Sequence, residues 1–203
     1  SWDNVNRYEG WGCGEWSELR DCPKVIDVHC EHLKKLLDCG VRGFRFDAVK
    51  HMRPAHVSKY VDFLRAQDES LFIYGEVLSL DLFMHLEYTV SSGISSTDFF
   101  MCAILFSAFH RRAIAGAPRG FEAACRAVIQ PGHLHQLSSL LEVATLGPQH
   151  VAFARNHDTA CNDPAPCGLG WSAQQAAAAT SFLLALPGRA VLLLPEDAAV
   201  ATT

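Results

Sequence analysis

Acidic residues follow three segments of the chain that have the composition of β-strands. Asp47 ends the segment "GVRGFRFD", Glu76 ends "LFIYGE", and Asp158 ends "VAFARNHD". Carboxylates held at fixed positions act as nucleophiles, general acids and general bases. The three acids are therefore the candidate catalytic residues, and the sequence around each one refines its role.

Asp47 is preceded by an arginine at strand spacing. Side chains alternate along a strand, so Arg45 and Asp47 lie on one face, while Phe44 and Phe46 lie on the other. A nearby guanidinium keeps a carboxylate ionised, and an ionised aspartate can attack an electrophilic carbon. The alternative is a structural ion pair at the end of a strand, which the spacing alone slightly favours.

The other two acids stand in different surroundings. Glu76 follows a glycine, which permits close approach to the backbone, and its flanking residues Tyr74 and Val77 suit a general acid. Taken alone, Glu76 is also typical of an ordinary loop after a strand. Asp158 follows Asn156 and His157, a group that fits either a helix N-cap or a metal site, although no H-E-x-x-H spacing supports zinc.

The elements that position these acids alternate along the chain. Strands are predicted near residues 41–46, 71–75, 95–99, 151–155 and 190–194, and the clearest helices at 23–39, 54–67, 80–90 and 172–186. This alternation predicts an α/β fold with a parallel sheet, whose chemistry gathers at the carboxyl ends of the strands. Asp47 and Glu76 lie one βα unit apart, so they come from neighbouring strands. Two carboxylates facing each other across a pocket are the arrangement used in glycoside hydrolysis.

Composition limits the alternatives. Hydrophobic residues make up 49% of the 203 residues, which is typical of a globular protein. The net charge of −5 and the absence of a basic block argue against binding to nucleic acid or an anionic membrane surface. Residues 187–189 divide the C-terminal apolar stretch into pieces too short to span a bilayer. Neither the oligomeric state nor the cellular compartment is indicated.

The eight cysteines form no C-x-x-C pair, so the spacings of zinc and redox sites are missing. Their positions favour mostly free thiols. Cys161 and Cys167 flank a proline-rich loop and can pair in an oxidising compartment.

Three segments, in this order along the chain, resemble conserved regions of the alpha-amylase family, glycoside hydrolase family 13: "GVRGFRFDAVKH", "IYGEV" and "FARNHD". A weaker similarity covers "ELRDCPKV", and the matching frame spans roughly residues 17 to 195. The resemblance implies a partial TIM (β/α)8 barrel, approximately strands 4 to 8. Residues 1–22 would be a remnant of the inserted small domain or loop, and residues 23–203 the C-terminal part of the catalytic barrel.

The resemblance also assigns catalytic roles. It implies that Asp47 is the nucleophile that forms the glycosyl intermediate and that Glu76 is the general acid/base. Asp158 matches the second aspartate, which binds sugar hydroxyls and helps to distort the ring.

Further residues match binding positions of the family. Arg45 corresponds to the arginine beside the nucleophile, His157 to a sugar contact in the cleavage subsite, and Lys50 to a sugar contact on the leaving-group side. Lys50 is expected to turn outward toward the substrate. Asp21 and the backbone oxygen of His51 match ligands of a structural calcium, which takes oxygen ligands of this kind.

The resemblance therefore predicts a retaining glycoside hydrolase that acts on α-1,4-glucans. A transglycosylase or an α-glucosidase with the same residues is the alternative, and the Lys50–His51 pair favours an amylase modestly. A third alternative is a truncated, non-catalytic fragment, because five of eight barrel strands leave two open edges. The family's first conserved region has no counterpart in this sequence.

Overall fold

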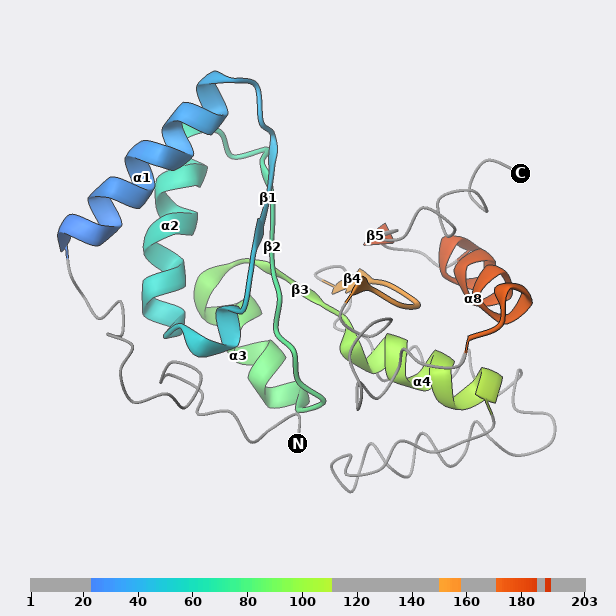
Figure 1. Ribbon diagram of the computed structural model, residues 1–203. Coiled ribbons are helices and arrows are strands. Elements are labelled where there is room, and N and C mark those ends of the chain that lie inside the picture. The colour runs from blue at the N-terminus through green and yellow to red at the C-terminus, as the bar shows by residue number, and fades with distance from the viewer. Residues whose placement is uncertain (1–22, 111–149, 158–170, 186–188, 191–203) are drawn as a thin grey trace. The chain divides into compact units, whose positions relative to one another are not determined.

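The computed structural model describes residues 23–110, 150–157, 171–185 and 189–190 (Figure 1). The chain divides into two compact units, Ser1–Thr97 and Asp98–Thr203, and each is described by itself. The predicted small-domain remnant at residues 1–22 lies outside the described residues. So do Asp21, Asp158 and the cysteine pair at positions 161 and 167.

Helices and strands alternate through the first unit. In chain order its elements are α1 (Pro23–Asp38), β1 (Gly43–Phe46), the 3-10 helix η1 (Val49–His51), α2 (Pro54–Gln67), β2 (Phe72–Gly75), α3 (Leu82–Ser92) and β3 (Ser95–Thr97). The strand β2 pairs in parallel with β1 on one side and with β3 on the other. This parallel arrangement confirms the α/β fold predicted from the alternating pattern.

Local sequence signals explain where these helices begin and end. Gly40 has a φ of 94°, a left-handed conformation that ends α1. Pro54 occupies the first turn of α2, where its missing N–H is not needed. Asp81 caps α3 by accepting the N–H of Phe83, and Gly93 ends that helix with a φ of 67°.

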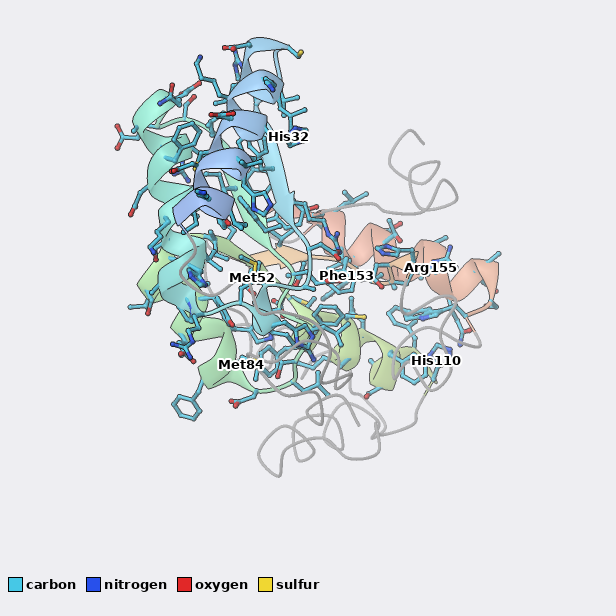
Figure 2. The ribbon with its side chains drawn as sticks, turned by 60° about the vertical axis from the view of Figure 1, so that its left-hand side comes forward. His32, Met52, Met84, His110, Phe153 and Arg155 are labelled. Carbon is cyan, nitrogen blue, oxygen red and sulfur yellow. The ribbon has the colours of Figure 1, made fainter. Side chains whose placement is uncertain are left out.

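The core of the first unit lies between the strands and the helices. Phe44 and Ile73, from β1 and β2, belong to one buried cluster with the apolar face of α2, which consists of Val57, Val61 and Leu64. Figure 2 labels Met52 and Met84, which pack against this cluster from the end of η1 and from α3. The face of β1 that carries Phe44 and Phe46 is therefore the helix-facing side.

The second unit contains α4 (Phe99–His110), β4 (His150–Ala152), α8 (Ala173–Ala185) and β5 (Arg189–Ala190), with β4 and β5 paired in parallel. The helix α4 is buried on all faces from Phe99 to Ala108, as expected for a helix that is apolar all round. Phe153, labelled in Figure 2, meets Phe99 edge to face with ring centroids 5.0 Å apart. None of the helices in the described part of the chain has both the length and the apolarity needed to cross a membrane.

The predicted strand at 95–99 is wrong at its C-terminal end. The strand β3 ends at Thr97, and α4 begins at Phe99. The reason is Asp98, whose buried carboxylate accepts the N–H of Met101 and so caps the helix. Asp98 therefore starts a helix.

Candidate active site

The side chain of Arg45 contacts both candidate catalytic acids of the first unit. Its Nη1 donates to Asp47 Oδ1 at 2.5 Å, and its Nη2 lies 2.9 Å from Glu76 Oε1. The predicted Arg45–Asp47 contact is thus confirmed. Sequence reasoning missed the second contact, which depends on the register that pairs Arg45 with Tyr74 across the parallel strands.

The two carboxylates differ in their access to solvent. The side chain of Asp47 is 72% exposed, whereas that of Glu76 is 8% exposed. Burial lowers the pKa of Arg45, but the carboxylates of Glu76 and Asp47 outweigh this effect and raise that pKa above its ordinary value. The site therefore holds a permanent cation between an open carboxylate and an enclosed one.

Backbone contacts fix Glu76 against the end of β1. Its Oε2 accepts the N–H of Ala48 at 3.0 Å, its own N–H donates to Phe46 O at 2.9 Å, and its carbonyl accepts the N–H of Val49 at 3.1 Å. A Cβ at the preceding Gly75 would lie 2.6 Å from Ile94 Cδ1 and 2.9 Å from Val49 Cγ2. The glycine before Glu76 is thus required by close packing, as the sequence predicted.

Ala48 adopts an unusual backbone conformation that serves this contact. Its φ of 50° and ψ of 35° lie in the left-handed region, which is uncommon for residues with a Cβ. Such conformations persist where the surrounding structure determines them, and they gather at functional sites. The hydrogen bond from Ala48 N–H to the Glu76 carboxylate is part of that surrounding structure. The sequence carried no sign of it.

Lys50 does not lie where the sequence analysis expected it. Its side chain is buried, with 5% of the residue exposed, and its Nζ donates to the carbonyl of Leu78 at 2.8 Å. The expectation that it turns outward is wrong because the ammonium reaches a backbone carbonyl inside the protein. Its predicted sugar contact remains untested.

A buried histidine holds the segment that follows Glu76. The ring of His85 lies 2.8 Å from Ser79 O through Nε2 and 2.7 Å from Ser96 Oγ through Nδ1. A carbonyl only accepts hydrogen bonds, so Nε2 carries the proton and Ser96 Oγ donates to Nδ1. Burial lowers the pKa of His85 to about 4, against the opposing effects of the Ser79 carbonyl and the Asp81 carboxylate. This histidine is neutral at ordinary pH and joins α3 to β3 and to the loop after β2.

Two further predicted site residues, His157 and His51, lie in the described part of the chain. His157 is exposed in the second unit, next to the buried Asn156. His51 is half-buried in η1. Within the described ranges, no three His, Cys, Asp or Glu residues come together as a metal-binding group.

Parts of the chain are similar to known proteins. No family model matches the chain. Pancreatic alpha-amylase from Struthio camelus is 34% identical over 33% of this chain and 17% of its own length. Alpha-amylase from Aeromonas hydrophila is 29% identical over 68% of this chain and 27% of its own length. Over these matched stretches the chain is similar to alpha-amylases. The chain matches 17% of the length of the first relative and 27% of the length of the second.

Solved structures extend this similarity to the fold. Alpha-amylase from Geobacillus thermoleovorans, complexed with acarbose, has a TM-score of 0.64 and 16% identity over 95% of this chain and 43% of its own. The cyclomaltodextrin glucanotransferase CldA has a TM-score of 0.60 and 16% identity over 84% of this chain and 32% of its own. The chain therefore shares its fold with part of these enzymes.

Proposed function

We propose that the protein is a retaining glycoside hydrolase that acts on α-1,4-glucans such as starch, glycogen and maltooligosaccharides. The observation that carries the proposal is the placement of Asp47 and Glu76 at the ends of neighbouring parallel strands, joined by Arg45. The alpha-amylase relatives and the acarbose complex of a structure with this fold support a carbohydrate substrate.

The proposed reaction has two steps. In the first, the exposed Asp47 carboxylate attacks the anomeric carbon while Glu76 gives its proton to the leaving glycosidic oxygen, so the C–O bond breaks and a glycosyl ester forms. In the second, Glu76 takes a proton from water, and the water oxygen attacks the same carbon and releases Asp47. Two inversions at one carbon retain its configuration.

The charge of Arg45 acts on both proposed steps. Before reaction the guanidinium contacts both groups: Asp47, whose carboxylate attacks, and Glu76, which must carry a proton to act as the acid. The ester formed on Asp47 is neutral, so the guanidinium then acts on Glu76 alone. A cation favours an ionised carboxylate, which is the form of Glu76 that the second step needs as its base.

Residues of the family resemblance complete the proposal. His157 and Asp158 would contact sugar hydroxyls next to the scissile bond. We also propose that β1 to β5 correspond to strands 4 to 8 of a (β/α)8 barrel. Asp21 and the backbone oxygen of His51 would supply two oxygen ligands to a structural calcium, and no step of the reaction is assigned to that ion.

The test replaces each acid in the full-length protein and measures reducing ends released from starch. Asp47→Asn and Glu76→Gln are expected to lower kcat by several orders of magnitude, while Asp62→Asn on the exposed face of α2 is the matched control. Turnover like that of the wild type in either active-site variant would contradict the proposal. Product lengths with and without added glucose separate hydrolysis from transglycosylation and from α-glucosidase action.

The non-catalytic alternative has its own test. The 203-residue chain is expressed alone and assayed for solubility, oligomeric state and release of maltooligosaccharides. A soluble, active monomer would exclude this alternative, whereas aggregation without activity would support it.

A further inference from the structure

We propose that Lys50 is a positioning residue that ties the segment after Asp47 to the segment after Glu76. The proposal rests on the catalytic roles given above to those two acids. It departs from the sugar contact that the family resemblance implies for this lysine, and it follows from where the side chain lies.

Three consecutive residues after Asp47 bind the segment that begins at Glu76. Ala48 N–H donates to the Glu76 carboxylate at 3.0 Å, and Val49 N–H donates to the Glu76 carbonyl at 3.1 Å. Lys50 Nζ continues the series by donating to Leu78 O at 2.8 Å. The first two contacts hold Glu76 itself, and the third holds the chain two residues beyond it.

The position of the ammonium makes this third contact structural. Lys50 is 5% exposed, and η1, on which it lies, also buries Val49 completely. A buried ammonium is stable only where protein acceptors replace its lost water. The carbonyl of Leu78 is such an acceptor, so the lysine and the loop after β2 fix each other.

This tie has a direct consequence for the proposed reaction. Two carboxylates act on opposite sides of one bond only at a defined separation, and a misplacement of about 1 Å can lower the rate roughly 100-fold. The backbone of the Glu76 segment is held by Lys50 on one side and by the side chains of Thr97 and His85 on the other. Loss of the lysine would therefore let the position of Glu76 relative to Asp47 vary.

The positioning role and the sugar contact predict different kinetics for Lys50→Met, which keeps the length of the side chain and removes its donors. If Lys50 is a positioning residue, the substitution affects every substrate alike. The kcat on p-nitrophenyl α-maltoside and the kcat on maltoheptaose are then expected to fall by the same factor, roughly tenfold to 100-fold, with little change in KM. As a sugar contact, Lys50 affects only the long substrate. Lys34→Met, an exposed lysine of α1, is the matched control and is expected to leave both substrates unaffected.

A loss of activity confined to maltoheptaose would overturn the proposal, and so would wild-type kcat on both substrates. A second measurement needs neither turnover nor the variant. Acetylation of the wild-type protein with acetic anhydride, followed by mass spectrometry of its peptides, compares Lys50 with the exposed Lys24 and Lys34. Lys50 is expected to react at least tenfold more slowly, with no further protection by maltoheptaose.

The kinetic and the labelling measurements distinguish a failure of the proposed function from a failure of the positioning role of Lys50. If the wild-type protein cleaves no glucan, the proposed function fails, and the labelling experiment still decides the placement of Lys50. Labelling of Lys50 as fast as Lys34, or protection that appears only with maltoheptaose, would overturn the positioning role even in an active enzyme.

Discussion

Acid destabilises this protein in part through one buried histidine. His85 is 0% exposed, and its pKa is lowered from 6.5 to about 4 because its charged form loses its hydration. The unfolded chain therefore binds a proton near pH 6.5, while the folded chain resists protonation until about pH 4. The contribution to stability is complete above pH 6.5 and is lost as the pH falls to about 4. At about 1.4 kcal/mol for each unit of pKa, the loss approaches about 3 kcal/mol.

The assay compares the free energies of unfolding of the wild type and His85→Gln in urea at pH 7 and pH 4. The variant keeps a polar side chain and removes the titrating group, so other groups that titrate cancel in the difference. The wild type is expected to lose about 3 kcal/mol more stability than the variant over this range. Equal losses in the two proteins, to within about 1 kcal/mol, would refute the placement of His85 as a buried neutral group.

Three further substitutions test the packing and the charges around the site. Arg45→Met is expected to lower the free energy of unfolding by about 3 kcal/mol because Glu76 loses its cation while buried. Adding Glu76→Gln to the Arg45→Met variant should restore most of the lost unfolding free energy in urea denaturation. If the losses of the two single variants simply add, the pairing of Arg45 with Glu76 is contradicted. Gly75→Ala is expected to lower the free energy of unfolding by about 1–3 kcal/mol in the same assay, because the added Cβ would overlap with Val49. An unchanged free energy of unfolding would show that the neighbouring side chains can move to make room. Ala48→Gly is expected to raise the unfolding free energy by up to about 1 kcal/mol, since glycine adopts the left-handed conformation freely, whereas a drop in stability would argue against that conformation.

The elements of the fold followed from local patterns in the sequence. The bounds of α2 agree with the segment 54–67 because Pro54 marks its start and an apolar face runs along it. The end of β3 was mispredicted because Asp98 and Phe99 fit the end of a strand as well as the start of a helix. Only the hydrogen bond from Met101 to Asp98 decides between the two.

The sequence named the candidate site residues, and only the local part of their contacts could be predicted from it. Strand alternation placed Arg45 beside Asp47, since that relation is local. The contacts from Arg45 to Glu76 and from Lys50 to Leu78 join residues far apart in the chain, and they depend on strand register and on the paths of long side chains. The left-handed backbone at Ala48 was also invisible, because alanine carries no preference for it.

The central claim is that Asp47 is the nucleophile and Glu76 its acid/base partner. The most direct measurement incubates the Glu76→Gln variant with α-maltosyl fluoride, a substrate whose leaving group needs no acid, and analyses the peptides by mass spectrometry. The first step then proceeds and the second stalls, so the peptide containing Asp47 is expected to gain the mass of one maltosyl group. Fluoride release without an adduct on that peptide, or with an adduct on another residue, would contradict the assignment.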